Sequence, residues 1–278
     1  DVAYGDLPVP QSQRDDALAL HREFLGLVAS VDAERPWLTP NARALDSQTI
    51  ETWMQERSTV PLAHAILQWY CRVGGSGGFE PSDASILHLA QTQKASPQAE
   101  APETWLIEGG AGQIPQLLAE QLKGEIRTSA AALRVGRDSD GTYVVEAADG
   151  SRHHCRGVVV AIPPALRTRL VFEPALPPAT TRLWQRTPMG SMIKILCVYE
   201  RAWWRDGGLN GYGQGNLATV QLTADSSPPS GTPGVLAGFV AADRALHLSG
   251  LPSAERRQLI LDDLIQYWGP RAGEPVEL

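Results

Sequence analysis

The sequence predicts an α+β fold, a helical portion combined with a mixed β-sheet, and three observations lead to this prediction. Apolar residues recur at helical spacing across residues 13–93. Short apolar runs separated by Asp- and Gly-rich turns fill residues 125–162. Residues 192–199 form a strand whose two faces are both apolar, which is typical of a strand covered on both sides. With 278 residues, 43% of them hydrophobic, the chain can build a sizeable core in one large domain or two.

The composition excludes several classes of function. The net charge is −7 and Lys and Arg do not cluster, so a nucleic-acid surface is not expected. The three cysteines and six histidines lack the spacing of metal ligands, so no metal site is expected, and the cysteines are interpreted as reduced and buried. No apolar run is long enough to cross a bilayer, and no signal-peptide pattern opens the chain. A cytoplasmic location is therefore expected.

Four helices are expected in the N-terminal portion. Residues 13–31 show an amphipathic pattern, and a second helix is expected after Asp46-Ser47, whose side chains suit an N-cap. A third helix, residues 61–72, has proline at its first position, where the missing N–H does no harm. The fourth helix covers residues 83–93.

A glycine cluster, Gly74-Gly75-Ser76-Gly77-Gly78, follows the third helix. A phosphate-binding loop would need a strand before the glycines and a Lys-Ser or Lys-Thr pair after them, and neither is present. The cluster is therefore interpreted as a helix C-cap and a flexible turn.

From Trp105 onward, strands replace helices as the main expectation. Gly109 to Gly112 is expected to open one helix. The strands expected after it are at about 125–128, 130–137, 142–148 and 157–162. Asp138-Ser139-Asp140-Gly141 and Asp149-Gly150 mark hairpin turns between them.

Lys194 lies in the middle of the apolar strand at 192–199. Two further strands are expected beside it, at about 217–223 and 234–241, followed by a helix capped by Ser253. A buried ammonium without a partner is costly, so this lysine must reach water, form a pair, lose its proton or serve a ligand. Spacing alone leaves open both a structural lysine at a strand edge and a functional lysine.

Several motifs follow one another in a particular order. They are Glu108-Gly109-Gly110-Ala111-Gly112-Gln113, the run from Val158 to Pro164, Phe172-Glu173-Pro174-Ala175-Leu176-Pro177, Met189-Gly190-Ser191 with Lys194, and the aromatic residues Tyr199 and Trp203-Trp204. This order resembles the flavin-containing amine oxidase family, of the monoamine and polyamine oxidase type. The resemblance spans residues 36–268 and is strongest over 107–204.

Members of that family begin with a Gly-x-Gly-x-x-Gly turn for the flavin dinucleotide and end with a second flavin-binding segment. This sequence shows neither, so it resembles the middle portion of such an enzyme. The resemblance implies that residues 1–107 are the helical part of the substrate domain. Residues 108–182 would be a β-meander of the flavin-binding domain, and residues 183–278 the sheet and helix of the substrate domain.

The resemblance also implies FAD as the cofactor. Lys194 matches the family's lysine that holds a water near the flavin N5, so it is the expected catalytic residue and a cofactor contact. Ala132 and Ala161 match positions that contact the dinucleotide, and Gly109 and Gly110 match a doublet at a strand-to-helix turn. Ordinary packing or a tight turn would explain these small residues equally well.

Leu67 and Tyr70, on the third helix, match the wall of the family's amine cavity, although so apolar a helix can equally be plain core. The implied reaction oxidises an amine C–N bond to an imine and reduces O2 to hydrogen peroxide. Flavin-binding segments of the same protein would be a further partner. Two alternatives stay open: a non-catalytic binding module that kept the fold, and a related oxidase that acts on amino acids.

Overall fold

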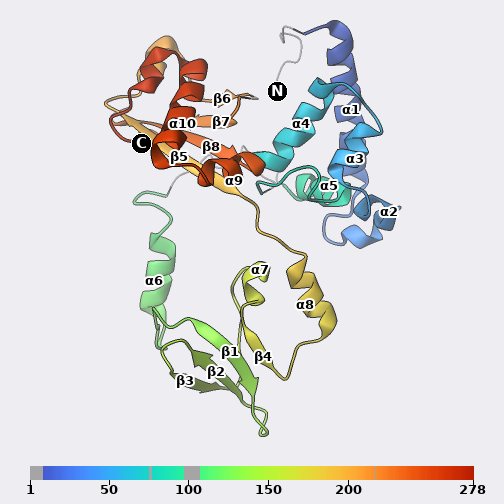
Figure 1. Cartoon of the computed structure of the whole chain (residues 1–278), viewed down its shortest axis with the longest axis vertical. Helices are drawn as coiled ribbons and strands as arrows, with labels where there is room; N and C mark the ends of the chain where they lie inside the picture. Colours follow the sequence, from blue (N-terminus) through green and yellow to red (C-terminus); the bar gives the residue numbers. More distant parts are fainter. Residues whose placement is uncertain (1–8, 75–76, 97–106, 216) are drawn as a thin grey trace. The chain divides into compact units, whose positions relative to one another are not determined.

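The computed structural model describes residues 9–74, 77–96, 107–215 and 217–278 (Figure 1). The chain forms two compact units, one made of Asp1–Gln98 with Gly190–Leu278 and the other of Ala99–Met189. These boundaries differ from the expected ones at 107/108 and 182/183. The assignment of the parts to a substrate domain and a flavin-binding domain stays a prediction.

The N-terminal part of the first unit is helical, as expected. Its helices are α1 (Gln11–Ser30), α2 (Ala42–Asp46), α3 (Ile50–Gln55), α4 (Pro61–Arg72) and α5 (Ile86–Ala95). They enclose a core in which Phe24, Trp53 and Leu67 are almost completely buried. The expected bounds of α4 are confirmed, because proline fixes its first turn and the glycine cluster begins two residues after it ends.

Thr49 and Ser85, and not Asp46-Ser47, cap α3 and α5. The Thr49 hydroxyl accepts a hydrogen bond from the Thr52 N–H, and the Ser85 hydroxyl accepts one from the His88 N–H. The expectation of a cap at Asp46-Ser47 is wrong because Asp46 is the last residue of α2. Its carboxylate instead accepts a hydrogen bond from the Ser85 hydroxyl at 2.9 Å.

The C-terminal part of the first unit is an antiparallel sheet covered on one face by a helix. The strands are β5 (Met192–Tyr199), β6 (Gly213–Gln214), β7 (Leu222–Asp225) and β8 (Gly234–Ala241), in the order β5-β8-β7-β6. Two helices follow, α9 (Asp243–Ser249) and α10 (Ser253–Trp268). α10 lies against the sheet (Figure 1) and buries Ile260 and Leu264 with Ile195 and Val240 of the strands. Ser253 is the first residue of α10 and not its cap, a position that Pro252 takes.

Two short backbone segments join the helical part to the start of β5. The Ser191 N–H donates to the Gly78 carbonyl at 2.8 Å, and the Ser191 carbonyl accepts from the Ala242 N–H at 2.8 Å. A Cβ on Gly190 would overlap the carbonyl oxygen of Gly77. Gly77 and Gly78, at the end of the glycine cluster, therefore let the backbone approach the start of β5 closely, whereas Gly75 and Ser76 lie outside the described residues.

Ala242 connects β8 to α9 in a conformation that L-residues rarely adopt, with φ 58° and ψ −137°. Replacing it with glycine removes strain worth about 1–3 kcal/mol, which offsets the loss of its buried methyl group. Ala245 is equally buried but lies within α9, so it provides the matched comparison. In urea unfolding we expect Ala242→Gly to be at least about 1 kcal/mol less destabilising than Ala245→Gly. Equal losses would show that Ala242 is not strained.

The second unit contains a mixed sheet with the order β3-β2-β1-β4, formed by β1 (Ala132–Arg137), β2 (Tyr143–Ala147), β3 (Arg152–Cys155) and β4 (Val171–Glu173). β1 and β4 are parallel and the other pairs are antiparallel. Both expected hairpin turns are confirmed, with Gly141 at φ 85° and Gly150 at φ 84°. The helices are α6 (Gln113–Gln121), α7 (Pro164–Arg167) and α8 (Pro178–Gln185).

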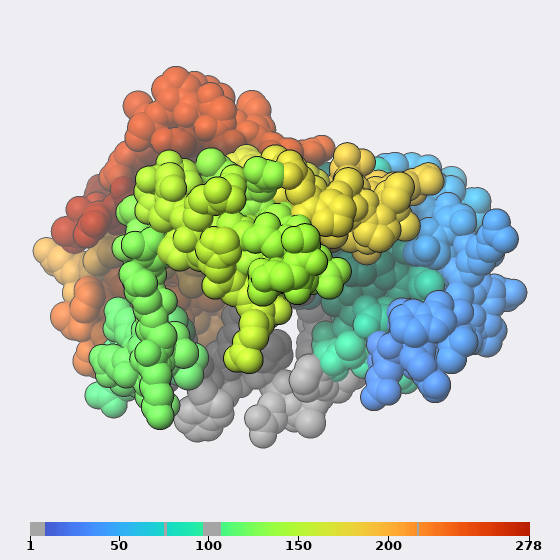
Figure 2. All heavy atoms as spheres, turned by 90° about the horizontal axis from the view of Figure 1, so that it is seen from below, coloured from blue at the N-terminus to red at the C-terminus, as the bar shows by residue number. Residues whose placement is uncertain are grey.

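Two of the strands expected in this unit are wrong. Residues 125–128 and 157–162 form no strand, and β3, which has a polar sequence, was not expected. Among the described residues of this unit, only Val135, Val144 and Ala147 are buried hydrophobic residues. α6 buries none of its residues, and the green atoms of this part of the chain are visible in the space-filling view of Figure 2. The second unit therefore forms the hairpins β1-β2 and β2-β3 but has a very small hydrophobic core.

Candidate active site

Lys194 lies on the open face of the edge strand β5. Burial alternates along this strand: Ile195 and Cys197 are buried on the face toward α10, whereas Met192, Lys194 and Leu196 are exposed on the opposite face. Among the described residues only one face of β5 is covered, which corrects the expectation of two covered faces. The apolar residues Met192 and Leu196, 46% and 50% exposed, flank the lysine along the strand.

Strand register places Lys194 in a row with three other side chains on the open face. Lys194 pairs with Phe239, Phe239 with Leu222, and Leu222 with Gln214. Directly opposed residues of an antiparallel sheet share a face, so the row crosses all four strands. It is about 14 Å long, because neighbouring strands lie about 4.8 Å apart.

Phe239 is the closest aromatic contact that the structure gives Lys194. The lysine Nζ lies 5.6 Å from the centroid of the Phe239 ring. A cation above an aromatic face is attracted by the negative charge of that face, by about 0.5–1 kcal/mol at an exposed site. The contact places the ammonium beside a ring of the neighbouring strand β8.

The sequence analysis did not identify Phe239 as a site residue. The apolar run at 234–241 predicts the strand, but it does not say which residue of β8 lies opposite Lys194. Along β8 the neighbours of Phe239 on the same face are Ala237 and Ala241. Both of these small residues are buried, at 1% and 0% exposed.

The open face fits the reactive ring system of a flavin. That ring system is flat and largely apolar, and it offers nitrogen and oxygen acceptors to a donor beside it. The face supplies an apolar surface at Met192, Leu196 and Phe239 and an ammonium at Lys194. This part of the chain is therefore suited to contact such a ring.

The glycines expected at the cofactor lie in a tight turn before α6. Gly109 and Gly110 have φ values of 77° and 89°, and the Gly110 N–H donates to the Ile107 carbonyl at 2.8 Å. The turn is closed by the Gln113 amide, which donates to the Glu108 carbonyl. Positive φ alone accounts for both glycines, so their contact with a cofactor stays a prediction.

Ala132 and Ala161 are exposed residues of the second unit. Ala132 is the first residue of β1, where the pairing with β2 shifts register. Ala161 lies outside any strand, directly before Ile162 and Pro163. No described contact brings Ala132, Ala161 and the two glycines together, so their roles as cofactor contacts stay predictions.

Leu67 and Tyr70 lie on α4 within the helical core. Leu67 is completely buried. Tyr70 is partly buried, with ring centroids 6.1 Å from Phe24 and 5.5 Å from Trp69, and burial raises the pKa of its hydroxyl. Both positions agree with the plain-core interpretation, and substrate contact stays a prediction.

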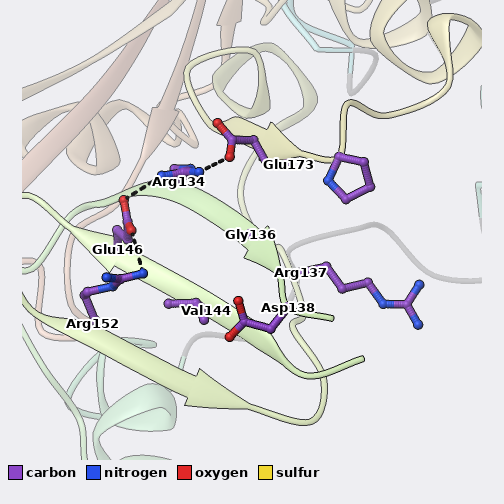
Figure 3. Close-up of a pocket in the computed structure, with 9 residues that line it drawn as sticks. Arg134, Gly136, Arg137, Asp138, Val144, Glu146, Arg152 and Glu173 are labelled. Atoms are coloured by element: carbon purple, nitrogen blue, oxygen red, sulfur yellow. Dashed lines mark hydrogen bonds and ion pairs between the residues drawn. The ribbon is translucent and has the colours of Figure 1, made fainter. Parts of the chain in front are cut away.

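A polar cavity of about 330 Å³ lies over the sheet of the second unit (Figure 3). Arg134 forms ion pairs with Glu146 and Glu173, and Arg152 forms one with Glu146 at 3.2 Å. Arg137 and Asp138 complete the charged lining, so three cations face three carboxylates. Because these charges balance and no expected site residue lines the cavity, it is not the candidate active site.

None of the helices in the described ranges combines the length and the apolar character needed to cross a bilayer.

Comparison with known proteins gives one consistent family. Residues 6–278 match the sequence model of the flavin containing amine oxidoreductases. An L-amino acid dehydrogenase of Synechocystis sp. is 37% identical over 99% of this chain and 58% of its own length. A putrescine oxidase of Kocuria rosea is 32% identical over 90% of this chain and 56% of its own length.

Solved structures agree with the sequence comparisons. Putrescine oxidase bound to putrescine superposes with a TM-score of 0.86 at 28% identity, covering 98% of this chain and 61% of that one. The chain thus spans a little over half the length of the relatives it matches. FAD is the expected cofactor, because the matching family model is that of flavin containing amine oxidoreductases, and relatives from Dictyostelium discoideum and Oncorhynchus mykiss are named flavin-containing amine oxidases. The family model matched over residues 6–278 and the superposition on putrescine oxidase show that this chain belongs to the flavin-containing amine oxidoreductase family.

Proposed function

We propose that this chain is the portion of an FAD-dependent amine oxidase that presents Lys194 to the reacting centre. The reaction converts an amine C–N bond to an imine and reduces O2 to hydrogen peroxide. The observation that carries the proposal is the position of the Lys194 ammonium, on an open apolar face and 5.6 Å from the Phe239 ring centroid. A lysine that only kept the strand edge soluble would have no need of this contact.

The bound flavin supplies the two-electron chemistry, so the chain needs no nucleophile of its own. Lys194 has three N–H donors, enough to hold a water and to direct positive charge at an acceptor beside it. Phe239 and Leu222 give the adjoining floor an apolar surface, which favours the neutral amine over its ammonium form. A neutral amine is required because the nitrogen lone pair must be free when the C–N bond is oxidised.

Ala132, Ala161, Gly109 and Gly110 are proposed to contact the dinucleotide from the second unit, and Leu67 and Tyr70 to border the amine. Their support is the match to the family's motifs. The contacts with the dinucleotide can be tested in the complete protein loaded with flavin. A single cysteine is placed at Ala132 or at Ala161, and its cross-linking to the flavin is measured. The exposed Ala148, in the same unit, is a matched control.

Amino acids are a second candidate substrate class, because the Synechocystis relative is named an L-amino acid dehydrogenase. A carboxylate-bearing substrate calls for a cation that pairs with the carboxylate, typically arginine. Turnover of phenylalanine compared with phenethylamine, which differs only by the carboxylate, separates the two classes. If phenylalanine is turned over faster, the proposed substrate class changes from amines to amino acids, and the proposed role of Lys194 stays the same.

This chain alone is expected to bind FAD weakly. The pyrophosphate is held by a glycine-rich turn at a helix N-terminus, and no Gly-x-Gly-x-x-Gly occurs in the sequence. Titration of FAD into the purified chain, followed by flavin fluorescence, should give no stoichiometric end point at micromolar concentrations. A sharp end point would show that the main anchor lies within these residues. Absence of flavin from the complete protein as purified would instead favour the non-catalytic binding module.

A further inference from the structure

A closed ring of hydrogen bonds joins the helical part of the first unit to its C-terminal part, which contains the sheet. The Gly78 carbonyl accepts from the N–H of Ser191, directly before β5, and the Ser191 carbonyl accepts from the Ala242 N–H, each at 2.8 Å. Asp243, the next residue, donates its N–H to the Glu80 carboxylate at 3.4 Å. Glu80 lies two residues after Gly78, which closes the ring.

Arg72, the last residue of α4, holds the Glu80 carboxylate in this ring. Its Nε donates to the two carboxylate oxygens at 3.1 and 3.0 Å, and its Nη2 donates to one of them at 2.6 Å. The two side chains are only 19% and 13% exposed. An arginine that grips both oxygens of a carboxylate fixes the geometry as well as adding energy, and burial protects the pair from screening by salt. One carboxylate therefore connects the end of α4 to the start of α9.

The hydrophobic cores of the two parts are separate among the described residues. The buried cluster of the helical part lies within residues 17–90, and the buried cluster of the C-terminal part lies within residues 195–272. The bonds of Gly78 and Ala242 to Ser191 join backbone atoms, so a change of side chain leaves their donors and acceptors in place. Glu80 supplies the one side chain of the ring, and it is the position where a mild substitution can open it.

We infer that Glu80, held by Arg72, is a positioning residue that fixes α4 against the sheet carrying Lys194. The inference rests on the proposed function, in which Leu67 and Tyr70 of α4 border the amine and Lys194 lies at the reacting centre. Reacting groups must be held closely in their productive geometry by the contacts that support them, and a misplacement of about 1 Å can cost roughly 10²-fold in rate. Glu80 supplies such support from outside the site.

Opening the ring should weaken amine binding and leave the reaction with O2 unchanged. Lys194 and Phe239 lie on adjacent strands of one sheet, and their pairing does not involve Glu80. Glutamine at position 80 keeps the shape of the side chain but loses the charge and the second oxygen that Arg72 grips. We expect Glu80→Gln to raise the apparent dissociation constant of the amine at least about tenfold, and to change the rate of the oxygen reaction by less than about twofold.

The test uses the complete protein with its flavin and stopped-flow absorbance. The substrate is phenethylamine or phenylalanine, whichever the unmodified protein turns over. Hydrogen exchange followed by mass spectrometry reports the ring directly, because the Ser191 and Asp243 amides should exchange at least about tenfold faster in Glu80→Gln.

Asp225→Asn is the control for a loss of stability alone. The Asp225 side chain is 11% exposed and accepts from the Arg205 Nε at 2.7 Å, within the C-terminal part. This substitution should lower the free energy of unfolding without changing the dissociation constant of the substrate. An equal rise in that constant for Asp225→Asn and Glu80→Gln would overturn the inference.

A second variant separates a joint action of the two residues from two independent effects. Arg72→Met should raise the dissociation constant as Glu80→Gln does, and the two substitutions together should add little more, because Arg72 acts through Glu80. Additive effects would overturn the inference. So would unchanged substrate binding in Glu80→Gln, or unchanged exchange at Ser191 and Asp243. If the unmodified protein oxidises neither compound, the proposed function itself is contradicted, and the inference that rests on it is overturned too.

Discussion

Replacing Lys194 with methionine in the complete enzyme is expected to slow the reaction of the reduced enzyme with O2 by roughly 10²-fold. Methionine keeps a long apolar side chain but removes the ammonium and its three N–H donors. In the proposed reaction the reducing equivalents of the amine would reach the bound flavin without passing through Lys194, so anaerobic reduction by the amine should change much less. Stopped-flow absorbance measures the two half-reactions separately.

Lys94→Met provides the control, because Lys94 is an exposed lysine at the end of α5. It should leave both half-reactions unchanged. If Lys194→Met abolishes anaerobic reduction and leaves the oxygen reaction intact, Lys194 orients the substrate instead. That result would remove the role that the family resemblance gives to this residue.

Replacing Asp263 with alanine is expected to lower the free energy of unfolding of the first unit by roughly 3–5 kcal/mol. Asp263 is 3% exposed, and its carboxylate accepts hydrogen bonds from the N–H groups of Thr219 and Val220 at 2.6 and 2.7 Å. Both of those residues are also buried, so the substitution leaves two donors without water or a partner. Urea unfolding followed by circular dichroism measures the loss.

The adjacent Asp262 is exposed and bonds only to Gln258 among the described residues, so Asp262→Ala should cost less than about 0.5 kcal/mol. Asp263→Asn keeps an oxygen acceptor and loses the charge, so its effect should fall between the two. An equal effect of Asp262→Ala and Asp263→Ala would mean that the buried hydrogen bonds add nothing to stability.

Segments with a strong local signal were predictable from the sequence. Pro61 and the glycines after Arg72 define α4, and the apolar run at 234–241 defines β8. In the second unit, a segment forms a strand only where a neighbouring strand is placed to pair with it. Residues 157–162 contain three consecutive valines, yet Val159 is 91% exposed and unpaired among the described residues. The polar β3 is a strand because the turn at Asp149-Gly150 places it beside β2.

Only the part of the candidate site that lies within one short stretch of sequence could be predicted from the sequence. Lys194 is conspicuous within an apolar strand, so the sequence alone marks it. Phe239 is 45 positions away, and only the register of β5 and β8 brings it opposite the lysine. The position of β5 at the sheet edge is equally a property of the whole topology. For this reason a structural edge lysine and a functional lysine could not be separated before the sheet was known.

The close approach of Gly190 to Gly77 affects how mutational data on this protein should be interpreted. Any side chain at Gly190 would displace a carbonyl of the helical part and shift the start of β5, four residues before Lys194. A saturation scan scored by turnover would then rank Gly190 with the most sensitive positions of the protein. It would do so although glycine has no group that could take part in the reaction, so sensitivity in such a scan is not evidence of chemical participation.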